Sequence, residues 1–545
     1  MKNTPAMADY ELRHIEALRK NLAGCTVLLK KDGSFPLEKP CTLAAYGSGV
    51  RRTIRGGTGS GEVNSRYSVT IEEGLQQAGF TLTGMEWHTG YEQARKKAHK
   101  AFLKQLKKDA KAVKQNFILY GMGKAMPEPE YNLPLNAEGD AAIYVVSRIS
   151  GEGNDRTPLK GDIRLTDSEV RDILALDKKF TRFMLVLNVG GVVDLSPVMD
   201  VRNILLLSQL GVETGGALAD ILLGKANPSG KLTTTWAAFE EYPEMPDFED
   251  MNETRYREGI YVGYRYFDTF RKPALFPFGH GLSYTEFRLG AVAVEANGAQ
   301  ITVRTFVENI GALAGRQVVQ VYLSKPSGKF DAPWQELCAF AKTHELAPGE
   351  TESVTCSFTL PEMAAYDTET ASYILEAGDY LVRVGVSSVE TAPAAVLHLD
   401  KTVTTLQANN VLGSTDFTDL TAPASTMERP AGVPVIEIDP VAIACETVAY
   451  DRTEEVLPEV DALTKEDAAL LLIGDFDPNA KGFASMIGTA GHHVCGAAGE
   501  SCDKISGFPF LIMADGPAGL RLAKEYYEDD KGKHAVGSTA MPASL

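Results

Sequence analysis

Uninterrupted apolar runs alternate with helical segments through the first half of the chain, and this pattern most constrains the fold. Five such runs are short and rich in aliphatic residues: 25–30, 41–47, 141–147, 183–189 and 203–208. Helical spacing fills several of the intervals, and Thr166 and Glu169 form a capping-box pattern at the start of one helix. Buried strands separated by helices predict a parallel sheet that is covered on both faces.

Beyond residue 285 the apolar pattern changes to a period of two. Four alternating segments are separated by Gly, Pro and Asn turns: 301–307, 317–324, 352–358 and 379–386. Short alternating strands at this density predict a β-sandwich. Residues 404–440 are rich in Thr, Ala, Pro and Val without periodicity, so we interpret them as a linker or wrap-around segment. The last block contains an apolar strand that ends at Asp515, and the carboxyl ends of parallel strands commonly bind ligands.

Charge and cysteine content exclude several classes of protein. The 72 acidic and 54 basic residues give a net charge of -18, which repels phosphate backbones and anionic membranes. We therefore expect neither a nucleic-acid nor a membrane partner, and we interpret the Lys-rich segment 91–115 as an amphipathic helix with a solvated face. The N-terminus has no secretory pattern and the seven cysteines are scattered, so we expect a cytoplasmic protein.

Glu152 stands between two glycines directly after a buried strand, in the phrase ISGEGNDR. The glycines allow a sharp turn that brings the carboxyl group to an exposed loop tip. The general acid of a glycosidase needs such a carboxyl group, partly shielded from water so that its pKa rises. Spacing alone is equally compatible with a solvated loop carboxylate, so both alternatives stay open. We expect Asp155 and Arg156 to form an ion pair that fixes the loop.

Two other phrases carry candidate ligand-binding groups. The loop GGTGSGE contains Ser60 but lacks the Gly-Lys-Ser/Thr ending of a phosphate loop, so we interpret it as the wall of a polar site or a flexible surface loop. In MADGPAGLR, Asp515 can accept hydrogen bonds from sugar hydroxyls while Arg521 holds nearby carboxylates; the alternative is a turn Asp. The spacing of the neighbouring histidines and cysteines matches no common zinc site: His492, His493, Cys495 and Cys502.

Taken together, several long phrases resemble glycoside hydrolase family 3, the β-glucosidase and β-xylosidase family. They are LLKKDGSFPL, GGTGSGE, ISGEGNDR, NPSGKL, GIYVGYRYFD, FPFGHGLSYTEF and ADGPAGLR. The resemblance implies an α/β-sandwich domain at 1–284, a fibronectin type III-like domain at 285–403, a linker at 404–440 and part of a (β/α)8 barrel at 441–545. The barrel segment comes last, as in the circularly permuted members of that family.

The resemblance also implies the activity of a retaining β-glucosidase that releases nonreducing-end glucose from a β-glucoside or oligosaccharide. Glu152 is then the general acid/base, Ser60 lies on a loop that reaches the glycone pocket, and Asp515 binds sugar hydroxyls with Arg521 beside it. Two carboxyl groups suffice for this chemistry, so no metal or other cofactor is expected.

The family's catalytic nucleophile has no counterpart in this sequence. A barrel of this type takes about 250 residues, far more than the length of the 441–545 segment, and no Asp-Trp phrase occurs in the chain. We therefore expect a barrel truncated before the nucleophile, and no turnover by this chain alone. The alternatives are a β-xylosidase or arabinofuranosidase of the same family, or a noncatalytic sugar-binding scaffold. The sequence leaves a homo-oligomer open.

Overall fold

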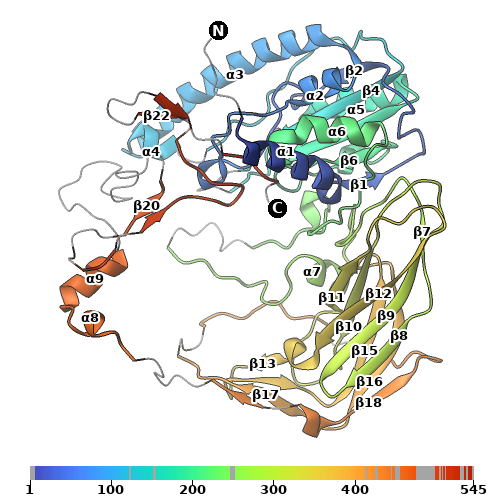
Figure 1. Cartoon of the computed structure of the whole chain (residues 1–545), viewed down its shortest axis with the longest axis vertical. Coiled ribbons are helices and arrows are strands. Elements are labelled where there is room, and N and C mark those ends of the chain that lie inside the picture. The colour runs from blue at the N-terminus through green and yellow to red at the C-terminus, as the bar shows by residue number, and fades with distance from the viewer. Residues whose placement is uncertain are drawn as a thin grey trace.

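The computed structural model of the chain contains a helix-covered sheet, a second body of strands and a set of smaller elements near the C-terminus (Figure 1). It describes residues 7–121, 124–150, 155–245, 252–411, 413, 415–423, 428–443, 445–448, 455–473, 497–501, 505, 507–509, 511–523, 525–527, 533–535 and 538–542. Among the helices of these residues, none has both the length and the apolar character that a membrane crossing requires.

A six-stranded sheet in the order β1-β6-β5-β4-β2-β3 forms the first body. Its strands are β1 (Val27–Lys30), β2 (Thr42–Tyr46), β3 (Thr81–Thr83), β4 (Ala141–Arg148), β5 (Phe183–Val189) and β6 (Ile204–Leu206). Strands β2 to β6 are mutually parallel, as the sequence predicts. Strand β1 differs from that prediction because it runs antiparallel to β6 at the edge of the sheet, an arrangement that needs no crossover helix.

Helices cover both faces of this sheet, which explains its uninterrupted apolar strands. One face holds α1 (Asp9–Asn21), α2 (Ile71–Gln77) and α6 (Thr214–Leu222), and the other holds α3 (Met85–Ala112) and α5 (Asp167–Lys179). Alternate residues of β4 enter the two cores, with Ile143 in the first and Tyr144 in the second. The capping box of α5 is confirmed, since Thr166 N donates to Glu169 at 2.8 Å and Glu169 N donates to Thr166 at 3.1 Å.

Helices α2 and α6 approach each other at two glycines. A Cβ atom on Gly74 would lie 2.2 Å from the carbonyl carbon of Gly215. A Cβ atom on Gly215 would lie 1.9 Å from the carbonyl oxygen of Thr70. The two helices are therefore in backbone contact at a place where any side chain would force them apart.

The second body is a β-sandwich, as the period-two segments predict. Its larger sheet has the order β11 (Glu336–Lys342), β10 (Val318–Ser324), β15 (Gly378–Gly385), β16 (Thr391–Leu399) and β18 (Val435–Ile438). The facing sheet contains β12 (Thr351–Thr359), β9 (Gln300–Asn309) and β7 (Phe287–Leu289), with β8 (Ala293–Asn297) paired to β9. A smaller sheet joins β13 (Ala365–Asp367), β14 (Ser372–Leu375), β17 (Val403–Gln407) and β19 (Glu446–Thr447). Inward residues such as Val303 and Val321 form one shared core.

Parts of the segment expected as a linker, 404–440, belong to this sandwich. Strand β18 pairs in parallel with β16, and most of β17 lies in the segment and pairs with β14. Leu420 packs against Tyr261 and Phe267. The segment therefore wraps around the sandwich and is not a free linker. Its hydrogen bonds and register come from the neighbouring strands, and its own short sequence does not reveal them.

The described residues near the C-terminus do not confirm the partial barrel expected at 441–545. Two helices, α8 (Pro458–Asp461) and α9 (Lys465–Ile473), precede β20 (Gly499–Glu500), β21 (Ile512–Met513), β22 (Glu525–Tyr527) and β23 (Lys533–Ala535). Strands β20 and β21 form one antiparallel pair, and β22 and β23 form another. A barrel strand needs parallel neighbours on both sides, and the strand before Asp515 instead leaves Leu511 and Met513 exposed.

Candidate functional site

The glycine-rich loop after β2 lies against the segment that leads to Glu152. Thr58 N donates to the carbonyl oxygen of Ser150 at 3.3 Å. A Cβ atom on Gly57 would lie 3.4 Å from the same oxygen, so this loop closely follows the chain that leaves β4. Glu152 itself lies outside the described residues.

The same loop also contacts the segment that contains Asp515 and Arg521. Ser60 occupies a 3-10 turn, Gly59–Gly61, and is half-buried. Directly after this turn, the carbonyl oxygen of Glu62 accepts a hydrogen bond from Arg521 Nε at 3.0 Å. Asn64 Nδ2 donates to the carbonyl oxygen of Leu522 at 2.8 Å. The structure therefore brings Ser60 and Arg521 to one edge of the α/β domain, although they are far apart in sequence.

Asp515 and Arg521 are direct partners, as the sequence leads us to expect. Arg521 Nη1 lies 3.5 Å from Asp515 Oδ2, and the backbone N of Arg521 donates to the carbonyl oxygen of Asp515 at 2.8 Å. Both side chains are partly exposed, at 27% for Asp515 and 36% for Arg521. The phrase ADGPAGLR thus forms a closed turn that presents a carboxylate beside a guanidinium at the surface.

Buried backbone contacts anchor this turn to the α/β domain. Ala518 and Ala540 enter the core on the face of α1, α2 and α6. Met541 N donates to the carbonyl oxygen of Ala518 at 2.7 Å, and Val212 N donates to that of Ala540 at 3.0 Å. A Cβ atom on Gly211 would lie 2.1 Å from the latter oxygen. These contacts explain how a segment near the end of the chain is held beside the loop of Ser60.

A buried ion pair fixes the end of β4, where the Glu152 segment begins. Arg148 Nη1 and Nη2 donate to the two carboxylate oxygens of Glu169 at 3.0 and 2.7 Å. Burial alone would lower the pKa of Arg148, but the charge and hydrogen bonds of Glu169 raise it above its usual value. Arg148 Nε also donates to the carbonyl oxygen of Asp162 at 2.9 Å.

The ion pair expected between Asp155 and Arg156 is replaced by another. Arg156 Nε donates to Asp162 Oδ1 at 2.8 Å, and Asp162 Oδ2 accepts from the backbone N of Thr157 at 2.6 Å. Adjacent side chains on an extended chain point in opposite directions, whereas Asp162 lies across a turn from Arg156. The loop is therefore fixed by a guanidinium and a carboxylate, but the carboxylate comes from six residues further along the chain.

Asn188 also positions this edge, and sequence reasoning missed it. The side chain lies at the end of β5 and is fully buried. Its Oδ1 accepts from Ile54 N at 2.7 Å, and its Nδ2 donates to the carbonyl oxygens of Ile54 at 2.9 Å and Ser208 at 2.7 Å. A polar amide within an apolar strand is the signal that could have identified it, because such a group needs several buried partners.

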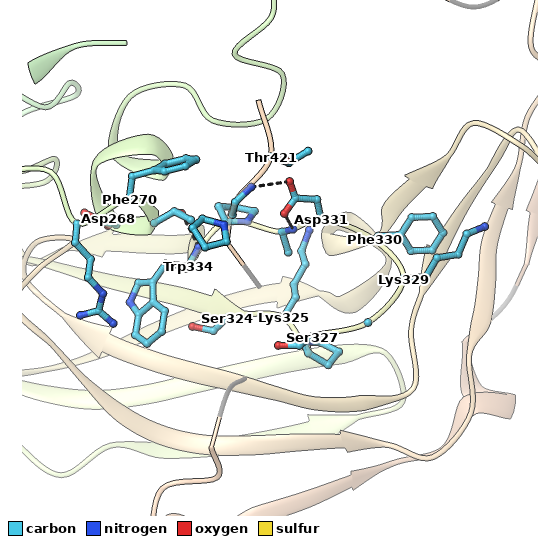
Figure 2. A pocket seen from close by; sticks show the side chains of 18 residues that line it. Asp268, Phe270, Ser324, Lys325, Ser327, Lys329, Phe330, Asp331, Trp334 and Thr421 are labelled. Carbon is cyan, nitrogen blue, oxygen red and sulfur yellow. Dashed lines mark hydrogen bonds between the residues drawn. The ribbon is translucent and has the colours of Figure 1, made fainter. Parts of the chain in front are cut away.

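A cavity of about 560 Å³ lies on the sandwich between the end of α7 (Tyr264–Thr269), the loop after β10 and residues 421–423. Figure 2 shows Asp331 directed toward the segment at Thr421. Asp331 accepts hydrogen bonds from the Tyr261 hydroxyl and, at 3.2 Å, from Ala422 N. These bonds fasten the wrap-around segment, and the predicted site residues Ser60, Asp515 and Arg521 do not line this cavity. We therefore assign it a structural role.

Among the described residues, no group of three or more His, Cys, Asp or Glu side chains is arranged to hold a metal ion. The histidines and cysteines considered for zinc in the sequence, His492, His493, Cys495 and Cys502, lie outside those residues. The groups that the structure does bring together at the loop of Ser60 are a hydroxyl, a carboxylate and a guanidinium. Such groups bind polyhydroxylated ligands by hydrogen bonds.

Comparison with known proteins places the chain in a family. Residues 26–284 match the glycosyl hydrolase family 3 C-terminal domain, and residues 317–388 match the fibronectin type III-like domain. Beta-glucosidase A of Butyrivibrio fibrisolvens is 31% identical over 98% of this chain and 70% of its own length. A beta-glucosidase of Ruminococcus albus is 30% identical over 91% of this chain and 53% of its own length.

Solved structures agree with this placement. Beta-glucosidase 3B from Thermotoga neapolitana, solved in complex with glucose, aligns with a TM-score of 0.62 at 35% identity. The alignment covers 73% of this chain and 55% of that one. A beta-glucosidase from Paenibacillus barengoltzii aligns with a TM-score of 0.61 at 33% identity, covering 71% of this chain and 44% of that one. The chain thus spans about half the length of these solved relatives, and it belongs to glycoside hydrolase family 3.

Proposed function

We propose that the edge of the α/β domain formed by the loop of Ser60 and the turn of Asp515 is the glycone-binding part of a β-glucosidase active site. The main support for this proposal is the hydrogen bond from Arg521 Nε to the carbonyl oxygen of Glu62. This bond places the turn that contains the Asp515 carboxylate beside the loop of Ser60. Asp515 accepts hydrogen bonds from glucose hydroxyls, and Arg521 orients its carboxylate. Relatives named beta-glucosidases, one of them solved with glucose, support the choice of sugar.

In this proposal Glu152 is the general acid/base of a retaining mechanism. It donates a proton to the leaving oxygen while a carboxylate nucleophile attacks the anomeric carbon, and it then activates the water that releases glucose. Support comes from the position of Ser150, two residues before Glu152, against the loop of Ser60.

The domain order proposed is that of a circular permutation. The matched family domain is called C-terminal, yet it occupies residues 26–284, ahead of the turn of Asp515. The Asp-Trp phrase expected for the nucleophile is absent, since Trp87, Trp236 and Trp334 follow Glu, Thr and Pro. We propose that this chain alone binds the sugar without turning it over.

One experiment tests binding and turnover together. Calorimetric titration with glucose should give saturable binding that Asp515→Ala weakens about tenfold, as expected for loss of hydrogen bonds to a charged group. Turnover of 4-nitrophenyl β-glucoside should not exceed that of Glu152→Ala. Unchanged glucose affinity in Asp515→Ala would contradict the glycone assignment, and turnover well above the Glu152→Ala control would contradict the proposed inactivity. Xylose and arabinose in the same titration test the alternative substrates.

A further inference from the structure

A cavity of about 520 Å³ adjoins the proposed sugar site. Its floor includes Thr58 from the loop of Ser60, and Ser147 and Ile149 from the chain that leads to Glu152. Further lining residues come from α3, from α4 (Phe117–Gly121) and from residues 124–128. The cavity therefore borders the loop of Ser60 and the chain that leads to Glu152, although Ser60, Asp515 and Arg521 are not in its lining, and it has the size of a small-molecule site.

The wall formed by the helices is apolar. Six side chains make up most of it: Phe102, Leu103, Leu106, Phe117, Ile118 and Met126. Leu106 is buried, whereas Ile118 is 71% exposed although it borders the cavity. Two aromatic rings and several aliphatic groups in one wall offer a surface for a flat apolar body.

Two arginines, Arg52 and Arg95, bring positive charge to the same cavity. Arg95 Nε is buried without a hydrogen-bond acceptor in the part of the chain that the structure describes. Burial and then the nearby charge of Arg95 lower the pKa of Arg52, while Tyr91, Glu128 and Glu92 act on it in the opposite direction. The two guanidinium groups are thus close enough to repel each other, an arrangement that an anion placed between them would relieve.

The acidic groups that border the cavity are already engaged. Glu128 accepts a hydrogen bond from the Tyr91 hydroxyl, and burial raises the pKa of Glu128, which favours its neutral form. Asp162 is paired with Arg156. The balance of charge at the cavity is therefore positive.

The charges on the surrounding surface add to the positive electrostatic potential at the cavity. Helix α3 carries seven lysines and one arginine against three acidic residues, in a chain whose net charge is -18. Lys124 adds a further cation to the lining. A local basic surface on an acidic protein attracts and concentrates small anions.

We propose that this cavity binds the aglycone of the substrate, and that the preferred aglycone is an aromatic carboxylate. The ring packs against Phe102 and Phe117, while the carboxylate accepts hydrogen bonds from Arg52 and Arg95. The inference rests on the proposed function for its description of the ligand as a glycoside. The chemistry of the cavity itself, an apolar wall beside two arginines, requires only an amphipathic anion.

Calorimetry on the full 545-residue chain tests the proposal with three probes. They are 4-carboxyphenyl β-glucoside, its methyl ester and free 4-hydroxybenzoate. We expect the carboxylate glucoside to bind about tenfold more tightly than the ester, because two charge-assisted hydrogen bonds are lost in the ester. Arg95→Gln and Arg52→Gln should reduce this preference to about twofold or less. Lys108→Gln, a loss of the same charge from α3 outside the cavity lining, should keep the preference.

Arg52 is more exposed than Arg95, so its variant remains informative if Arg95→Gln fails to fold. Equal affinity of the native chain for the acid and the ester, or an unchanged preference in Arg52→Gln and folded Arg95→Gln, would overturn the proposal. Asp515→Ala separates the two sites, because it should weaken both glucosides and leave 4-hydroxybenzoate unaffected. If 4-hydroxybenzoate binds in an Arg95-dependent way while Asp515→Ala changes nothing, the cavity assignment stands and the glycone assignment fails.

Discussion

Arg148 and Glu169 form an ion pair with two hydrogen bonds, of 3.0 and 2.7 Å, in which the side chains are only 4% and 3% exposed. The pair joins the end of β4 to the first turn of α5. Glu169 also accepts the capping hydrogen bond from Thr166 N, so one carboxylate serves the helix and the strand. Because Ser150 follows two residues after Arg148, this pair holds the end of the strand close to the last described residues before Glu152.

Removing one partner of this pair should strongly destabilise the α/β domain. We expect Glu169→Gln to lower the free energy of unfolding by about 3–5 kcal/mol, because Arg148 keeps a buried charge without its counter-ion. Urea denaturation followed by circular dichroism measures the effect. Glu138→Gln is a matched control, since Glu138 pairs with Lys179 while 85% exposed, and its effect should stay below about 1 kcal/mol. Similar losses in both variants would contradict this assignment.

His88 should make the stability of the domain depend on pH. Burial lowers the pKa of His88 from 6.5 to about 4, and its Nε2 donates to the carbonyl oxygen of Ala45 at 3.0 Å. The unfolded chain takes up a proton near pH 6.5 and the folded chain does not, so this stability is complete above pH 6.5 and is lost as the pH falls toward 4. We expect a loss of about 2 kcal/mol between pH 7 and pH 5 that is missing in His88→Gln.

Denaturant titrations at pH 7, 6 and 5 measure this difference. Carboxylates also titrate as the pH falls, so the informative quantity is the change in the stability of the native protein minus the change in the stability of His88→Gln. Parallel pH profiles for the two proteins would show that His88 is protonated equally in the folded and unfolded chains.

The contact between α2 and α6 should not tolerate a methyl group. Gly215→Ala would place a Cβ atom 1.9 Å from the carbonyl oxygen of Thr70, so the helices must separate. We expect a loss of about 1–3 kcal/mol, measured as a lower thermal midpoint. At Gly61 a Cβ atom would meet nothing within 4 Å, so Gly61→Ala should leave the midpoint nearly unchanged. An unchanged midpoint in Gly215→Ala would mean that the crossing is looser than described.

Arg521 should hold the turn of Asp515 on the α/β domain. Arg521→Ala removes the bond to the Glu62 carbonyl and the contact with Asp515. We expect amide hydrogen exchange at residues 518–522 to accelerate about tenfold, since local opening of the turn becomes easier. Arg304→Ala removes an exposed ion pair with Glu295 in the sandwich, and it should leave exchange in this turn unchanged. Unchanged exchange in Arg521→Ala would show that the backbone contacts alone hold the turn.

The sequence predicted those parts of the fold in which one local pattern decides the structure. Strand β5 (Phe183–Val189) has the predicted bounds, and the capping box of Thr166 and Glu169 forms as expected. The direction of β1 was not predictable, because an apolar edge strand has the same sequence pattern in either orientation. Strand β18 (Val435–Ile438) escaped notice since its pairing with β16 is set by a partner far away in the chain.

The candidate site also contains some contacts that the sequence predicts and others that depend on residues far apart in the chain. The contact of Asp515 with Arg521 was predictable because a short turn joins them. The role of Arg95 was not, since a Lys-rich helix has the composition of a solvated face and only the tertiary structure shows that Arg95 Nε is buried. The docking of Arg521 on Glu62 likewise depends on residues 459 positions apart, and no local pattern specifies such a contact.

The hydrogen bond between Asn64 and Leu522 closes a ring of 458 positions that contains the sandwich and most of the α/β domain. Closing so long a ring has an entropic cost, so this edge should assemble after the domains have folded. A sugar that contacts both the loop of Ser60 and Asp515 would bridge the two ends of this ring and stabilise the contact between them. Cleavage of the chain between the two contacts would then weaken sugar binding, because a cut chain can no longer hold both halves at high effective concentration.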